Sequence, residues 1–327
     1  MKLSAVIADY LAFRRTNGYR DNTIKNDRQT LARLLKYAGD IELTDLTATH
    51  IDGLLGSLLE QRFAVGTVNN TQAGISAFAR WCRSRGIAPQ NWDPIAGRRY
   101  VPMQQVTRTY VPLHDFPKVL DCAQNPRDRA LIALGLFTMA RQSELVNLRV
   151  RDLDLTAGTL HIVVIKSYKV DTMPLPAELD VEMRRWMKAY QAAFGGVMDP
   201  DWYLVPAMEQ EGFSTWRLAP DRKVSRSEDI VRRVLERAGY TDKRLGVHAL
   251  RRSAARALFD ELAGEGYDGA LRLVSAMLHH SSSTTTEKYL SLDIDRKRRD
   301  DRIGGRSLFP SLAADNVVSL RRDGTDG

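Results

Sequence analysis

Cysteine is scarce in this chain, which has only Cys82 and Cys122 among its 327 residues. The two are far apart and lack C-x-x-C spacing, so they indicate reduced, buried thiols rather than a disulfide framework. The chain also has no apolar run long enough to cross a membrane. Asp9 interrupts the stretch where a signal peptide would need continuous apolar residues. We therefore expect a cytoplasmic protein with no membrane partner.

Motifs for common cofactors and metals are missing as well. The chain has no G-x-x-x-x-G-K-S/T loop for ATP phosphates, no H-E-x-x-H pair for zinc, and no acidic cluster suited to a two-metal nuclease. We expect chemistry that needs no cofactor and no metal ion.

The composition is that of a soluble globular protein, with 43% apolar and 27% charged residues. A length of 327 residues predicts about two domains. The net charge of +8 favours a polyanionic partner such as nucleic acid, although the same excess occurs in proteins that are merely soluble.

The first hundred residues show the apolar spacing of four amphipathic helices, which we expect near residues 3–16, 24–38, 48–59 and 65–85. Four short helices of this kind form a compact bundle. In the last of them Arg80, Arg83 and Arg85 lie outside the apolar stripe. These arginines suit either a solvated face or contact with phosphate.

Residues 91–112 contain prolines and glycines and no helical stripe, so they are expected to connect two domains. The part that follows is predicted to contain a buried helix at 127–137 and a β-hairpin with strands at 159–165 and 170–175. Two further helices are expected at 177–194 and 228–239, with an irregular segment between them. The expected fold class is mainly α (α+β), an all-α helical bundle followed by a mostly helical domain with a small antiparallel β-sheet.

The residues from His248 to Tyr289 carry the strongest chemical signal. The segment after His248 has helical apolar spacing, and its opposite face holds His248, Arg251 and Arg252. Imidazole beside guanidinium suits an anion, because guanidinium offers a fork of donors matched to phosphate oxygens. His280 precedes Tyr289 by nine residues, across a Ser/Thr-rich turn that can cap a short helix. A phenol attacks an anion once the charge is neutralised and its proton is accepted.

These residues resemble the sequence boxes of the tyrosine recombinases, also called the phage integrase family. His248-Ala-Leu-Arg251 matches the H-x-L-R box, and Leu278-His279-His280 followed by Tyr289 resembles the L-G-H box and its nucleophile. The run from Thr138 through Arg141 to Glu144 resembles the T-G-x-R-x-x-E box.

Two departures from the family pattern stand out, because His279 and Met139 occupy positions where the family has glycine. The family also carries a lysine on the hairpin. Lys166 matches it, and Lys169 is close enough to compete for the assignment.

The resemblance implies a role for each of these residues. Tyr289 would attack a DNA phosphodiester, and Arg141, Arg251 and His280 would hold the phosphate oxygens. His248 would accept or relay the tyrosine proton, and Lys166 would protonate the leaving 5′ oxygen. Glu144 would position the arginine or histidine from behind. It also divides the chain into a core-type DNA-binding domain (1–97), a linker (98–112), a catalytic domain (113–305) and a tail (306–327) that is a candidate contact with a neighbouring protomer.

The implied function is site-specific DNA recombination through a 3′-phosphotyrosine, in the integration of a phage or mobile element. Xer-like resolution of chromosome or plasmid dimers, and a non-catalytic DNA-binding protein of the same fold, are the alternatives. Expected partners are double-stranded DNA with paired recombination sites, three further copies of the chain in a homotetramer on DNA, and an accessory directionality factor. We expect no additional arm-site DNA-binding domain. Donation of Tyr289 in cis or in trans stays open.

Overall fold

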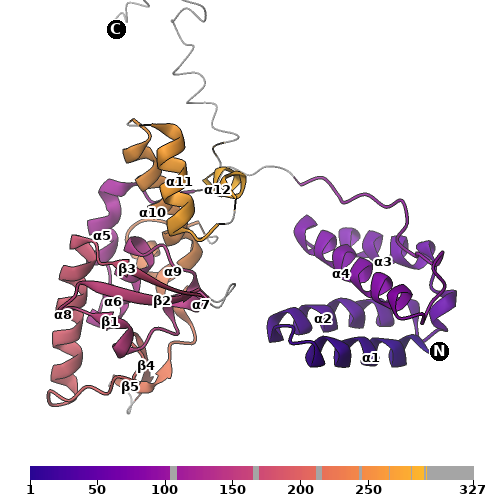
Figure 1. Ribbon diagram of the computed structural model, residues 1–327, viewed down its shortest axis with the longest axis horizontal. Coiled ribbons are helices and arrows are strands. Elements are labelled where there is room, and N and C mark those ends of the chain that lie inside the picture. Colours follow the sequence, from indigo (N-terminus) through magenta and orange to yellow (C-terminus); the bar gives the residue numbers. More distant parts are fainter. Residues whose placement is uncertain are drawn as a thin grey trace, which may run out of the picture. The chain divides into compact units, whose positions relative to one another are not determined.

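The computed structural model describes residues 1–103, 109–164, 169–210, 216–242, 245–264, 266–280, 282–290 and 292. The chain folds as two compact units, residues 1–106 and 107–327 (Figure 1). None of the helices in the described ranges combines the length and the apolar character needed to cross a membrane.

The first unit is a bundle of helices, α1 (Leu3–Thr16), α2 (Asp21–Ala38), α3 (Ala48–Glu60) and α4 (Val65–Ser84). Their apolar faces meet in one core, in which the rings of Phe78 and Trp81 on α4 lie edge-on to Tyr10 on α1. The predicted helical bundle is confirmed. Arg83 was expected on a solvated face or in contact with phosphate. Instead its Nη1 donates to the Trp92 carbonyl at 2.9 Å and holds the segment after α4 in place.

The predicted linker, residues 98–112, has structure at both ends. Val101 exchanges two hydrogen bonds with the Asn69 side chain of α4, at 2.9 and 3.0 Å. Val111 is buried in the core of the second unit, and its backbone N–H donates to Ser253 Oγ at 2.8 Å. Each end of this segment therefore packs on the unit nearest to it in sequence.

The second unit is mostly helical, as predicted. Its helices are α5 (Phe116–Asp121), α6 (Pro126–Phe137), α7 (Gln142–Leu145), α8 (Ala177–Ala193), α9 (Ser227–Arg237), α10 (Val247–Leu262), α11 (Tyr267–Met277) and α12 (Ser283–Leu290). Helix α6 is buried on nearly every side and packs against α8 and α10. Gly135 eases the close approach of α6 and α10, because a Cβ there would lie 3.0 Å from Leu250 Cδ1 and Leu250 would have to shift. This packing brings the end of α6 close to Arg251.

Two antiparallel sheets complete the second unit. The predicted hairpin is present as β2 (Thr159–Val164) and β3 (Lys169–Pro174), with Val164 opposite Lys169, and β1 (Leu153–Asp154) extends it to three strands. The segment predicted to be irregular contains a second sheet, β4 (Pro206–Gln210) paired with β5 (Trp216–Lys223). That prediction was wrong because the two prolines within the strands, Pro206 and Pro220, sit at a strand end and at a register shift, where they remove little pairing.

Candidate active site

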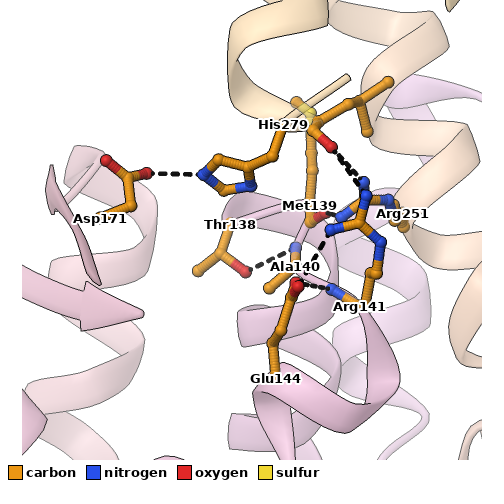
Figure 2. A network of polar contacts seen from close by, with 9 residues as sticks. Thr138, Met139, Ala140, Arg141, Glu144, Asp171, Arg251 and His279 are labelled. Atoms are coloured by element: carbon orange, nitrogen blue, oxygen red, sulfur yellow. Dashed lines mark hydrogen bonds and ion pairs between the residues drawn. The ribbon is translucent and has the colours of Figure 1, made fainter. Parts of the chain in front are cut away.

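Arg251, on α10, lies at the buried centre of the site, and only 1% of its surface is exposed. Its Nη1 donates to the Met139 carbonyl, and its Nη2 donates to the Leu278 carbonyl at 2.6 Å (Figure 2). These carbonyls follow the C-terminal ends of α6 and α11, where backbone oxygens carry partial negative charge. Burial lowers the pKa of Arg251, and neighbouring Tyr289 and Glu144 raise it in part. The guanidinium is thus fixed in one orientation.

Both carbonyls belong to turns with left-handed backbone. Met139 has φ of 53° and His279 has φ of 49°, and Arg62 is the only other non-glycine residue with positive φ in the described part of the chain. These are the two positions where the sequence departs from the family's glycine. The Thr138 hydroxyl steadies the first turn by donating to the Leu134 carbonyl at 2.6 Å and accepting from Ala140 N–H at 3.1 Å. The left-handed turns are therefore retained despite their side chains.

Arg141 lies beside Arg251, at the start of α7. Glu144, whose side chain is fully buried, accepts from Arg141 twice, from the backbone N–H at 2.7 Å and from Nη1 at 2.9 Å. Arg141 Nη2 also donates to the Leu278 carbonyl at 3.3 Å, so the two guanidinium groups share one acceptor. The charge of Arg141 contributes to lowering the pKa of Arg251. Two arginines held this close suit an anion with several oxygens.

Tyr289 on α12 contacts the rings of two histidines. Its ring centroid is 5.4 Å from that of His248 on α10 and 5.4 Å from that of His280, and both pairs are edge-on at 82° and 83°. Electrostatic interaction with Tyr289 is among the effects that raise the pKa of Arg251. The structure therefore brings together the predicted tyrosine, both histidines and both arginines.

His280 rests on a buried chain of hydroxyl groups that the sequence did not reveal. Its Nδ1 is 2.9 Å from Thr286 Oγ1, and Thr286 donates to Ser275 Oγ at 2.9 Å. Thr286 is completely buried and Ser275 nearly so. Thr286 therefore engages Nδ1 of His280, which leaves Nε2 as the nitrogen that can face a ligand. Thr286 precedes Tyr289 by three residues, which places both on one face of a helix. This spacing was the feature of the sequence that could have indicated a role for Thr286.

Other predicted residues lie elsewhere. Lys166 falls outside the described residues, and Lys169 is exposed at the first position of β3. Arg252, which was expected on the same helical face as His248 and Arg251, donates from Nη2 to the Thr109 carbonyl at 3.4 Å. Within the described ranges, no group of three His, Cys, Asp or Glu side chains is arranged to hold a metal ion.

The chain resembles known proteins in sequence and in fold. A relative, the tyrosine recombinase XerC of Mycobacterium sp. (strain KMS), is 29% identical over 259 residues, covering 75% of this chain and 79% of the relative. The fold is similar to that of the Tn1549 transposon integrase solved with circular intermediate DNA, with a TM-score of 0.68, 16% identity, and coverage of 91% of this chain and 99% of that one. It is also similar to that of the lambda integrase tetramer bound to a Holliday junction, with a TM-score of 0.64, 16% identity, and coverage of 87% and 79%.

Two family descriptions match the chain itself. Residues 7–88 match the N-terminal SAM-like domain of phage integrases, and residues 110–296 match the phage integrase family. The second match covers more than half of the chain and includes the whole cluster around Arg251. The chain belongs to the phage integrase family, the tyrosine recombinases.

Proposed function

We propose that this protein cuts and rejoins DNA at specific sites through attack of Tyr289 on a backbone phosphodiester. The observation that carries the proposal is the edge-on contact of the Tyr289 ring with the rings of both His248 and His280, near the buried guanidinium of Arg251. These groups supply a nucleophile, a proton acceptor and fixed positive charge in one place.

The reaction begins when a phosphate binds to the guanidinium groups of Arg141 and Arg251. Their fixed forks, with His280 Nε2 in its protonated form, donate to the non-bridging oxygens and stabilise the charge of the pentavalent transition state. Glu144 keeps Arg141 in place, since it binds both the backbone and the side chain of that residue. No bond in this step depends on a metal ion.

Strand cleavage then exchanges one phosphoester bond for another. The Tyr289 oxygen forms a bond to phosphorus, the phenolic proton passes to His248, and the bond from phosphorus to the 5′ oxygen breaks. Lys166, or Lys169 in its place, donates a proton to that oxygen. The product is a 3′-phosphotyrosine that keeps the energy of the original bond, so a second 5′ hydroxyl reverses the steps and joins a new strand.

The first unit supplies a surface suited to reading DNA sequence. A groove of about 590 Å³ between α2 and α4 is lined by Asn26, Gln29, Asn70 and Arg33, together with several threonines. Amide side chains pair with adenine edges and arginine with guanine edges in the major groove. This groove supports the proposal that double-stranded DNA is the partner.

Recombination needs paired sites, so we propose a homotetramer that assembles on two duplexes, with each chain contributing one Tyr289. Residues 306–327 are the candidate contact between protomers. Light scattering should give a monomer without DNA and a tetramer on synapsed sites, and deletion of residues 307–327 should abolish the tetramer while leaving binding to a single site intact. Stable tetramers without DNA would contradict this assembly.

Integration of a phage or mobile element is the role we propose, and dimer resolution of the Xer kind is the second candidate because an XerC protein is among the relatives. Denaturing capture of the protein from cells, followed by sequencing of covalently attached DNA, tests both. An attachment site beside a mobile element supports integration, together with any accessory directionality factor encoded there. A site near the replication terminus supports dimer resolution, and capture of no covalent DNA supports a non-catalytic DNA-binding protein.

A further inference from the structure

A second cluster of arginines surrounds a cavity in the second unit. The cavity has a volume of about 610 Å³, and its lining includes Arg127, Arg226, Arg233 and Arg237. Asp128 is the only carboxylate among the lining residues, so their formal charge is strongly positive. None of these arginines belongs to the cluster around Arg251.

Arg127 is the buried member, with 7% of its surface exposed. Its Nε lies 3.0 Å from Asp128 Oδ1, but the geometry of that ion pair gives neither atom a hydrogen bond, and both atoms are buried. Burial lowers the pKa of Arg127, Asp128 raises it and the charge of Arg233 lowers it further. A buried guanidinium whose Nε lacks an acceptor and which has a like charge beside it is stabilised when an anion binds there.

The backbone adds positive potential at the same place. The residues that cap the N-terminal ends of α6 and α9, Asn125 and Arg226, both line the cavity. Helix N-terminal ends carry partial positive charge and attract anions. The acidic residues in the first turn of α9 are engaged elsewhere, because Glu228 accepts from Val247 N–H at 2.9 Å and Asp229 pairs with Arg232 at 3.2 Å.

We propose that this cavity binds a phosphate group, at a site separate from the proposed strand-cleavage site. Guanidinium forks match phosphate oxygens in pairs, and several arginines around one cavity favour an anion with several oxygens over a single carboxylate. The two sites lie at opposite ends of α6, whose 12 residues span about 18 Å. The phosphate belongs either to a free phosphate-bearing molecule or to DNA outside the cleaved position.

The test uses the full chain and inorganic pyrophosphate, titrated calorimetrically at constant ionic strength. Arg233→Glu changes an exposed arginine of the cavity. Lys188→Glu is the matched control, because it makes the same charge change at an exposed position of α8 outside the cavity. Arg141→Ala identifies any pyrophosphate that binds at the other arginine cluster. Circular dichroism confirms that each variant is folded.

Pyrophosphate should bind to the wild type, Lys188→Glu and Arg141→Ala, and about tenfold or more weakly to Arg233→Glu. If pyrophosphate does not bind but Arg233→Glu weakens binding to a non-specific duplex about tenfold more than Lys188→Glu does, the phosphate comes from DNA. Equal behaviour of Arg233→Glu and Lys188→Glu in both assays overturns the proposal. Pyrophosphate binding that is lost only in Arg141→Ala overturns it too. Neither readout requires Tyr289 to be a nucleophile.

Discussion

The imidazole of His279 meets the carboxylate of Asp171, with 2.9 Å between His279 Nε2 and Asp171 Oδ2. This contact joins the turn after α11 to strand β3, and Figure 2 shows it beside the arginine cluster. A glycine at position 279 would form the same left-handed turn without the link. The side chain that departs from the family pattern therefore ties the hairpin to the turn whose Leu278 carbonyl holds Arg251.

We expect this link to position the hairpin during cleavage. His279→Asn keeps a residue that tolerates the left-handed turn, and Asp171→Asn keeps the size of its partner. Each change should slow cleavage severalfold, and the double variant should be no slower than the worse single one. A double-mutant cycle of unfolding free energies should give a coupling of about 0.5–1 kcal/mol. Additive effects on both cleavage and stability would show that the contact is incidental.

The hydroxyl chain behind His280 gives a second prediction. Thr286→Val keeps the shape but removes the hydroxyl, which leaves His280 Nδ1 and Ser275 Oγ without their shared partner, so the protein should lose about 1–2 kcal/mol of stability. Cleavage should fall about tenfold and its pH profile should shift, because His280 Nδ1 loses the hydroxyl that it contacts. Thr286→Ser should restore both. Identical pH profiles for the valine and serine variants would contradict the role of Thr286.

Arg251 should not tolerate replacement by lysine. A lysine ammonium lacks the planar fork that reaches the Met139 and Leu278 carbonyls together, so one buried acceptor would lose its donor at a cost of about 1–3 kcal/mol. Arg252→Lys, one position along α10, is the control and should change stability by less than about 0.5 kcal/mol. Denaturant titration compares the two. Equal stabilities would mean that the fork is not needed.

The helical parts of the fold could be predicted because their apolar spacing is regular, as in the helices of the first unit. Strands β4 and β5 could not be predicted, since Pro206 and Pro220 suggest a loop. Only the pairing of the two strands shows that these prolines lie where few backbone hydrogen bonds are lost. Strand β1 has two residues and no periodic signal.

The site was predicted from its side chains, whereas its backbone partners were not. The acceptor of Arg251 Nη1 is the carbonyl of Met139, 112 residues away, and sequence motifs describe side chains and not carbonyl directions. Thr286 was missed although it shares a helical face with Tyr289. The Ser/Thr run around it is also typical of a helix cap. Only the burial of Thr286 in the structure distinguishes it from the neighbouring hydroxyl residues.

The general acid can be assigned by changing the leaving group. Replacing the bridging 5′ oxygen of the DNA with sulfur gives a leaving thiolate that needs no proton, because thiols are far more acidic than alcohols. Lys166→Ala should therefore cleave the oxygen substrate poorly and the sulfur substrate at close to the wild-type rate. If this recovery is seen for Lys169→Ala instead, Lys169 is the acid. Gel assays of strand cleavage on the two substrates distinguish these results.

The identity of the nucleophile tests the central claim most directly. The protein is incubated with DNA carrying its captured site, denatured and digested with protease, and the peptide that retains nucleotide is identified by mass spectrometry. We expect one adduct, on Tyr289, and none for Tyr289→Phe, which should still bind the DNA. An adduct on any other residue, or a covalent complex formed by Tyr289→Phe, would contradict it.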